Sequence, residues 1–148
     1  MRRAHIRAMD QVPIVLQSFV AGFPVLLTHF IVTMLLWLFS MSLYYWLTPH
    51  NEIKMVRDGN LATAICSGGV AMGLAIPLAF CLAGSVSVWD IIIWSIPILL
   101  VQIATFYLLG KVLGDMSHRL ERNEIAVAIY LFMVRMGSAF LVTAAIAG

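Results

Sequence analysis

The chain has 148 residues, of which 62% are hydrophobic and only 11% are charged, and its formal net charge is +2. An average soluble domain carries about a quarter charged residues and about half apolar ones. These proportions therefore exclude a water-soluble globule and a disordered chain. They predict an integral membrane protein.

The first apolar stretch is too long for a single crossing. It contains no Asp, Glu, Lys or Arg from residue 11 to residue 51, and Pro13 and the triplet Gly22-Phe23-Pro24 divide it. Proline suits the start of a helix and breaks its interior. We therefore expect residues 1–23 to form a basic tail and a short interfacial helix at 12–21, with the first span at 24–47.

Three further spans follow from the positions of the remaining charges. Residues 59–89 and 91–110 carry no full charge, and after Glu124 only Arg135 interrupts the apolar run. A spanning helix needs about 20 apolar residues. We expect helices at 61–83, 86–112 and 125–147, which makes the protein all-α with four transmembrane helices.

Two charged loops, at residues 48–60 and 114–124, lie on the same side of the membrane because two spans separate them. Together with Lys111 they hold five of the nine Lys and Arg residues, whereas the N-terminal tail on the opposite side holds three. The positive-inside rule then places both loops in the cytoplasm and both termini in the periplasm.

The first loop opens with Thr48-Pro49-His50-Asn51-Glu52. Thr48 can cap a helix that Pro49 opens, and a carboxylate in the first turns favours the helix dipole. We expect a short interfacial helix through Arg57, after which Asp58-Gly59-Asn60 turns the chain back into the membrane.

A shift of 64 residues aligns the two halves of the chain. Leu61-Ala62-Thr63-Ala64-Ile65 then falls on Ile125-Ala126-Val127-Ala128-Ile129, and Asp58-Gly59-Asn60 falls on Arg122-Asn123-Glu124. Each half contributes two spans, so both enter the membrane in the same sense. We expect one membrane domain of two tandem two-helix repeats, residues 24–84 and 85–148. Chance similarity between apolar segments is the alternative.

Three glycines mark candidate helix-packing faces. Gly69 and Gly73 form a GxxxG pattern, and Gly137 aligns with Gly73 after the shift. Small residues let helix backbones approach closely in lipid. The pattern fits either dimerisation or packing inside one four-helix bundle.

Arg135 is expected near the middle of the bilayer, because it lies eleven residues beyond Glu124 in the fourth span. A charge there costs about 2.5–3.5 kcal/mol, so the guanidinium should face protein or water. Gln102 lies at similar depth and is the best partner within the chain, while carbonyls, a lipid phosphate or another subunit are alternatives. The arginine either lines a conduction or substrate site, makes a contact between subunits, or snorkels along its helix to the membrane surface.

A polar stripe on the first span contains His29, Thr33 and Ser40, which share one helix face with Tyr44. Such a stripe either lines a narrow hydrated path or makes hydrogen bonds between helices, and the second arrangement is the more common.

Known chemical motifs are missing from the sequence. Cys66 and Cys81 lie about 22 Å apart on one predicted helix, too far for a disulfide. The loop residues His50, Glu52, Asp115, His118 and Glu121 match no metal-ligand spacing. We therefore predict no catalytic residue, metal, cofactor or nucleic-acid partner.

At the loop motif the sequence resembles the bacterial inner-membrane proteins classed as domain of unknown function 350. The resemblance covers residues 16–148, and the N-terminal tail lies outside it. It departs at Thr143-Ala144-Ala145-Ile146 and at Arg135. The resemblance implies a small inner-membrane protein of two tandem two-helix units, without an established activity. Its matching positions are Thr48-Pro49-His50-Asn51-Glu52, Gly59-Asn60, Ala62, Ala64, Gly69, Gly73, Pro77-Leu78, Ser85-Val86-Ser87, Asp90, Trp94 and Gln102.

The leading hypothesis is a non-enzymatic inner-membrane component that assembles with itself, contacts lipid and docks a cytoplasmic protein partner, in a role such as envelope maintenance. The second hypothesis is an ion channel or small-solute transporter with Arg135 and Gln102 in the path. A membrane-embedded enzyme or lipid-binding protein that uses the two polar loops ranks third.

Overall fold

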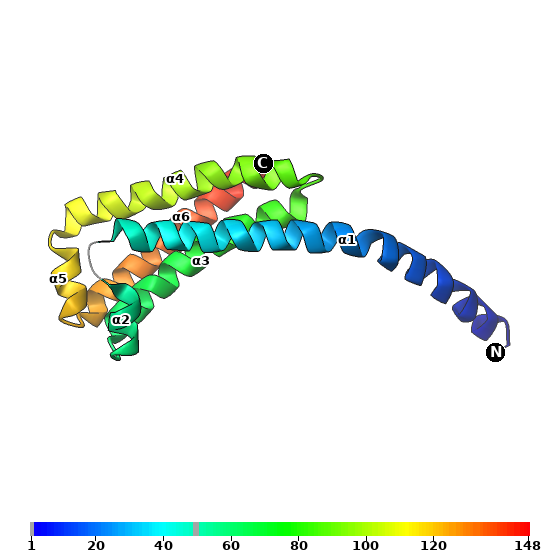
Figure 1. Ribbon diagram of the computed structural model, residues 1–148, viewed down its shortest axis with the longest axis horizontal. Helices are drawn as coiled ribbons and strands as arrows, with labels where there is room; N and C mark the ends of the chain where they lie inside the picture. The colour runs from blue at the N-terminus through cyan, green and yellow to red at the C-terminus, as the bar shows by residue number, and fades with distance from the viewer. Residues whose placement is uncertain (1, 49–50) are drawn as a thin grey trace.

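The computed structural model describes residues 2–48 and 51–148, with residues 2–12 and 14 described as backbone alone. The described residues form helices and turns without a strand (Figure 1). In chain order the helices are α1 (Arg2–Leu47), α2 (Glu52–Arg57), α3 (Leu61–Gly84), α4 (Val88–Leu113), α5 (Met116–Glu121) and α6 (Ile125–Ala147).

Four of these helices are long and apolar enough to cross a membrane. The candidate spans are Val15–Leu47, Leu61–Gly84, Val88–Leu113 and Ile125–Ala147, and each has a mean hydropathy of at least 2.0 in its most apolar window. The predicted all-α membrane fold with four spans is therefore confirmed. The last three spans begin and end within two residues of the predicted limits.

The expected break before the first span is wrong. Residues 12–21 are helical, but they belong to α1, which runs for 46 residues through Pro13 and Pro24 without interruption. A proline removes one backbone hydrogen bond from the ladder. Apolar helices tolerate this loss because the bonds on either side remain.

The centre of the bundle is α3, which packs against all the other helices, most extensively against α6. At Gly69 the two backbones come so close that an added Cβ would lie 3.1 Å from the Cα of Phe132. The core has two clusters of buried side chains, one around Ala62, Cys66, Ala128 and Leu131 and the other around Tyr44, Val70, Leu74 and Ile98.

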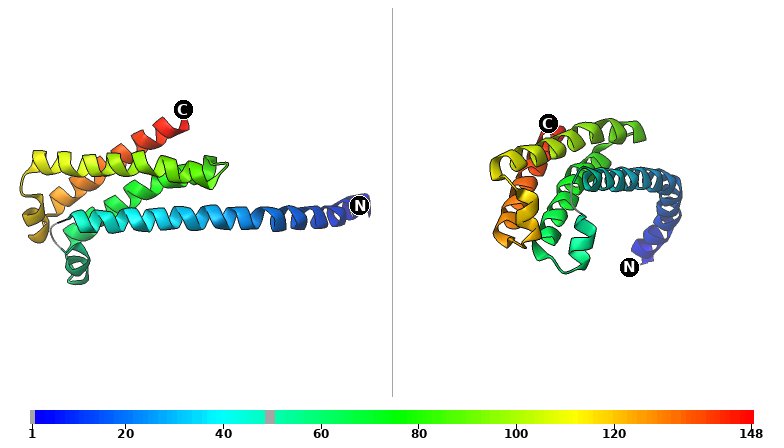
Figure 2. Two further views of the ribbon diagram at one scale, coloured as in Figure 1. Left: turned by 45° about the horizontal axis from the view of Figure 1, so that its top comes forward. Right: turned by 60° about the vertical axis from the view of Figure 1, so that its left-hand side comes forward.

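Helix α1 belongs to the bundle only along its C-terminal half. Met41 and Tyr44 are buried against α3, and the Trp37 indole donates a hydrogen bond to the Ala71 carbonyl at 2.9 Å. Towards the N-terminus α1 leaves the bundle and extends well past the α3–α4 turn (Figures 1 and 2). We call residues 2–21 the α1 overhang, because Gly22 already lies level with Ser85 in that turn.

The 64-residue repeat is visible in the backbone of the helices in the two charged loops. In the first loop the N–H groups of Asp58, Gly59 and Asn60 bond to the carbonyls of Lys54, Val56 and Met55. The N–H groups of Arg122, Asn123 and Glu124 bond to the carbonyls of His118, Leu120 and Arg119. Every donor and acceptor is displaced by 64 residues, and helices α2 and α5 have the same length of 6 residues.

The two loops also bind each other. Asn60 caps α3 by accepting from the Thr63 N–H at 2.8 Å, while its amide donates to the Leu120 carbonyl at 2.8 Å. In return, the Asn123 side chain accepts from the Ala62 N–H at 2.8 Å. These bonds fix the start of α3 against the end of α5, which sets the depth of both α3 and α6.

Candidate functional site

A buried carboxylate lies at the start of α2. Glu52 is 2% exposed, although it belongs to a charged loop, because α2 folds back against α3. Its carboxylate accepts hydrogen bonds from the Tyr44 hydroxyl at 2.7 Å and from the Ser67 hydroxyl. Asn51 places it by capping α2, with the Asn51 side chain accepting from the Lys54 N–H at 3.0 Å.

Tyr44 connects this carboxylate to the predicted intramembrane arginine. Its hydroxyl binds Glu52, and the guanidinium carbon of Arg135 lies 5.1 Å from the centre of its ring. The Phe106 ring approaches the same guanidinium at 5.7 Å, and the two rings meet edge to face. Three helices, α1, α4 and α6, therefore surround the guanidinium group.

Arg135 is 1% exposed, so it is buried by protein instead of snorkelling to the membrane surface. Its Nε and both terminal nitrogens lack a hydrogen-bond partner among the described residues. Contact with an aromatic ring contributes about 2 kcal/mol in a desolvated site. Removing an ion from water costs several kcal/mol, so two rings leave much of the charge uncompensated.

Gln102 lies on α4, one turn before Phe106, but its side chain binds to α3. Its amide nitrogen donates to the Gly73 carbonyl at 3.0 Å, and its Oε1 is buried without a partner in the described part of the chain. A Cβ at Gly73 would lie 3.1 Å from that amide, so the glycine is what admits Gln102 to α3. The structure thus brings Arg135 and Gln102 to one place without a direct bond between them.

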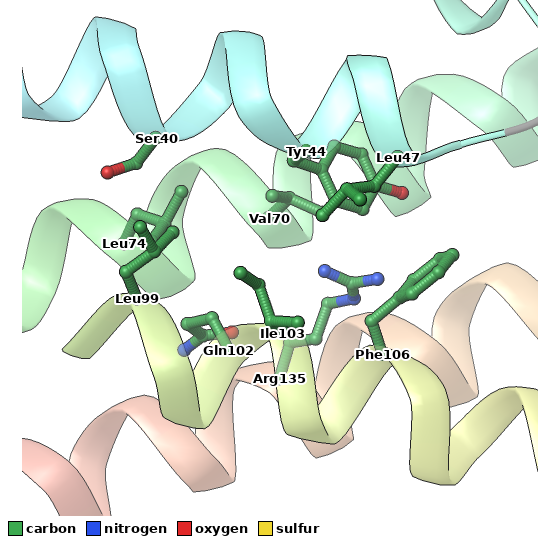
Figure 3. Close-up of a pocket in the computed structure, with 10 residues that line it drawn as sticks. All are labelled: Ser40, Tyr44, Leu47, Val70, Leu74, Leu99, Gln102, Ile103, Phe106 and Arg135. Atoms are coloured by element: carbon green, nitrogen blue, oxygen red, sulfur yellow. The ribbon is translucent and has the colours of Figure 1, made fainter. Parts of the chain in front are cut away.

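A small cavity separates these groups. It lies between α1, α3 and α4, with Ser40, Tyr44, Gln102 and Arg135 in its walls, and the rest of the lining is apolar (Figure 3). Its free volume of about 10 Å³ is enough for one water molecule. Figure 3 shows Arg135 rising from α6 into this space, towards Tyr44.

The polar stripe of α1 is largely satisfied within its own helix. His29 Nδ1 donates to the Val25 carbonyl at 2.8 Å, Thr33 to His29 and Ser40 to Leu36, both at 2.8 Å. Thr33 and Ser40 are buried, and Ser40 lines the cavity, whereas His29 is half-buried at the opposite end of the span. These residues do not converge on Arg135 as a group.

The loop motif divides into described and undescribed parts. Thr48 does not cap α2 as expected, because its hydroxyl donates to the Tyr44 carbonyl at 2.9 Å and closes the end of α1 instead. Pro49 and His50 lie outside the described residues. Within the described part, no group of three His, Cys, Asp or Glu side chains is arranged to hold a metal ion.

The three candidate packing glycines have different surroundings. Gly69 contacts Phe132 and Gly73 contacts Gln102, so both lie at helix contacts. Gly137 is exposed, and an added Cβ there would meet nothing within 4 Å. Gly137 therefore lies at no helix contact within the described chain, and dimerisation is the alternative that stays a prediction for this glycine.

Sequence reasoning did not connect Glu52 with Arg135. The glutamate belongs to a charged loop, which hydropathy places at the membrane surface and not at the depth of the arginine. The available signal was the polar residues that face Glu52 from two spans, Tyr44 and Ser67. A lone loop carboxylate opposite two intramembrane hydroxyls indicates a helix that folds inward.

Comparisons with known proteins agree with the resemblance seen in the sequence. The family model for a Domain of Unknown Function (DUF350) matches residues 18–146. The chain is 24% identical over 103 residues to the UPF0719 inner membrane protein YjfL of Escherichia coli strain K12, a match that covers 70% of this chain and 78% of that protein. YjfL of Escherichia coli O157:H7 matches equally well. No solved structure matches the chain.

Proposed function

This chain belongs to the DUF350 family, and we propose that it is a non-enzymatic component of the bacterial inner membrane that assembles with a second copy of itself through α1. The similar protein from Escherichia coli is named an inner membrane protein, which supports this location. In the proposed orientation the loops with α2 and α5 face the cytoplasm, where they dock a protein partner, and both termini are periplasmic. A role in envelope maintenance is consistent with such an assembly.

The observation that carries this proposal is the apolar length of α1. Its candidate span, Val15–Leu47, has 33 residues and is about 50 Å long, whereas the hydrocarbon core of a bilayer is about 30 Å thick. When α3, α4 and α6 occupy the membrane, the α1 overhang extends beyond them. Phe19 is 60% exposed there, and Val15, Leu16 and Val20 are similarly uncovered. Apolar side chains outside the bilayer core need a protein surface to cover them.

A groove beside the overhang supports a second copy as that cover. It has a volume of about 710 Å³ and lies between Gly22, Val25 and Leu26 of α1 and Leu82 and Val86 at the α3–α4 turn. An apolar ridge and an apolar groove thus follow one another along α1, with the ridge beyond the α3–α4 turn and the groove beside it. Two copies related by a twofold axis along the membrane normal can pack ridge against ridge and so cover the adjoining grooves, because an isologous interface uses the same patch twice.

Disulfide trapping in native membranes tests the assembly. We expect Phe19→Cys to form a covalent dimer on mild oxidation, since equivalent residues near a twofold axis meet. Ile96→Cys is the matched control, because Ile96 is 56% exposed on α4, away from the overhang. Both native cysteines, Cys66 and Cys81, are buried and do not compete.

Absence of the Phe19→Cys dimer, or equal trapping at Ile96→Cys, would contradict assembly through α1. A strictly monomeric particle in mild detergent would contradict assembly in any form. Native mass spectrometry of the purified full chain distinguishes these cases.

Transport through the bundle is the second candidate, and the buried guanidinium of Arg135 favours it. The cavity beside Arg135 has room for about one water molecule, so a path needs further opening between α1 and α4. Flux of anions into liposomes should fall at least tenfold in Arg135→Ala if the path exists. Equal flux in both proteins, or none in either, would end this candidate.

A further inference from the structure

We propose that the groove between α1 and α3 holds one acyl chain of a membrane phospholipid, whose head group lies at the α3–α4 turn. The groove beside the overhang continues into a second, deeper hollow, because both have Phe30 of α1 and Leu82 of α3 in their linings. The hollow at the turn has a volume of about 710 Å³ and the deeper one about 270 Å³, which is the size range of ligand sites. Since α1 and α3 of a single copy form this α1–α3 groove, the site goes beyond the proposed assembly and does not depend on it.

The α1–α3 groove follows from the way α1 lies on α3. At Trp37 the two helices are joined, because the indole donates a hydrogen bond to the Ala71 carbonyl at 2.9 Å. One and two turns further along α3 come Ala75 and Ala79, whose small side chains leave space below α1 and line the deeper hollow. Beyond this point α1 leaves the bundle. The groove therefore begins where Trp37 joins the helices, and it widens towards the α3–α4 turn.

The length of the groove matches one leaflet of a bilayer. Ala75 lines its deep end and Ser85 lines its wide end, and these residues of α3 and the following turn lie ten positions, or about 15 Å, apart. The hydrocarbon core is about 30 Å thick, so each leaflet supplies about 15 Å of acyl chain. A chain that enters beside the turn can therefore reach the deep end without leaving its own leaflet.

The polar side chains of the groove are placed where a phospholipid has its polar part. His29 and Ser85 line the hollow at the turn, and both are half-buried. An imidazole and a hydroxyl can hydrogen-bond to the ester and phosphate oxygens of a lipid. In the deeper hollow the polar side chains of the described lining are Thr33 and Trp37, and both already bond to backbone carbonyls. The deep end therefore offers a ligand only apolar contact.

Other occupants fit the α1–α3 groove less well than an acyl chain. An ordered water needs two to four polar partners, which the deep end lacks. In the proposed assembly the overhang of the second copy lies beyond the α3–α4 turn, so it does not extend to the depth of Ala75. The outer side of the groove is open, because Phe30 is 47% exposed and Met34 is 39% exposed. At this depth the surrounding medium consists of lipid chains.

Native mass spectrometry of the full chain in mild detergent tests this site, with palmitoyl-oleoyl phosphatidylethanolamine as the probe. Wild type should retain one lipid per chain under collisional activation that removes all others. Ala79→Phe places a ring in the deeper hollow and should lower the lipid-bound fraction about tenfold. Ala104→Phe is the matched control and should keep the lipid, because Ala104 is an exposed alanine of α4, and α1 and α3 form the groove.

Fluorescence of Trp37 tests the same site in a bilayer. The measurement uses a chain in which the other three tryptophans, Trp46, Trp89 and Trp94, are replaced by phenylalanine. A phospholipid brominated near the end of its acyl chain should quench Trp37, which lines the deep end of the groove. Ala79→Phe should reduce this quenching, and Ala104→Phe should not.

Two results would overturn the proposal. One is a wild-type chain that retains no lipid, or only detergent, and this result decides the matter even if Ala79→Phe does not fold. The other is equal lipid retention in Ala79→Phe and Ala104→Phe, which would mean that the lipid binds elsewhere. Native mass spectrometry separates monomers from dimers, so a lipid-free dimer would overturn this site alone, whereas a lipid-bound monomer without any dimer would support the site and contradict the assembly.

Discussion

The two halves of the chain share the backbone of their loop helices and turns but differ in what they bury. Their loop helices, α2 and α5, have the same length and are followed by turns whose backbone hydrogen bonds correspond one to one at a spacing of 64 residues. In the first repeat α2 buries Glu52, which binds Ser67 on α3. At the corresponding positions the second repeat buries Met116 and Leu131.

Deeper in the membrane it is the second half of the chain that buries a charged residue, and the first half has a small apolar one. Arg135 on α6 corresponds to Ala71 on α3, which contributes only its carbonyl to Trp37. One repeat therefore supplies the buried carboxylate and the other supplies the buried guanidinium, with Tyr44 of α1 between them. A repeated backbone sets the depth of both groups, and the departure from repeat symmetry creates the polar site.

The largest effect is expected when the first repeat is made to resemble the second. Glu52→Met copies the residue at position 116 and leaves the Tyr44 and Ser67 hydroxyls without their acceptor. It also removes the only buried carboxylate near Arg135 in the described chain. Breaking a buried charged network costs about 3–5 kcal/mol. Unfolding in SDS followed by far-UV circular dichroism measures the loss.

Met116→Leu is the control for this exchange, because it keeps an apolar side chain of similar volume at the equivalent place. Its cost should remain below about 1.5 kcal/mol. If Glu52→Met costs no more than Met116→Leu, the buried carboxylate contributes nothing to the fold, and the contrast between the repeats loses its energetic basis.

Gly73 and Gly137 occupy corresponding positions, and replacing each with alanine should change the free energy of unfolding less than Glu52→Met does. The two changes should have opposite signs. Gly73→Ala places a methyl group 3.1 Å from the Gln102 amide and disturbs its bond to the residue 73 carbonyl, at a cost of about 1–3 kcal/mol. Gly137→Ala meets open space and should be neutral or stabilising by up to about 1 kcal/mol, because alanine is the better helix former. The same SDS titration measures both, and equal effects would contradict the asymmetry.

Much of the fold was predictable because the bilayer imposes a simple rule. Charges at Asp58, Asp90 and Glu124 stop apolar runs, and the last three spans follow within two residues. The 64-residue repeat could also be predicted, because Gly59 and Asn123 occupy corresponding positions in the two turns and both have a positive φ. The continuous α1 was not predictable from Pro24, because a proline in an apolar helix removes one hydrogen bond without specifying a break.

The site was predictable only in part. The cost of a charge in lipid identified Arg135, and similar depth identified Gln102, which the structure places in the same cavity. The places of Glu52 and Phe106 near Arg135 depend on how α2 folds back and on which face α4 turns inward. Both follow from tertiary contacts that hydropathy does not encode. Helical spacing grouped Tyr44 with His29, yet only Tyr44 faces the arginine.

The smallest expected effect concerns the turn that the repeats share. Gly59 has φ +87° and Asn123 has φ 59°, so both occupy the left-handed region, but only Asn123 has a side chain that binds the other loop. Asn123→Gly keeps the turn and removes the acceptor of the Ala62 N–H, which should cost about 1 kcal/mol. The reciprocal Gly59→Asn should change stability by less, because asparagine tolerates this conformation and loses no bond.

Hydrogen exchange at the Ala62 amide distinguishes the two variants. The exchange rate should rise about fivefold in Asn123→Gly and remain unchanged in Gly59→Asn. Unchanged exchange in Asn123→Gly would mean that the loops are held together by the Asn60 amide alone, and that the second repeat positions α6 without help from the first turn of α3.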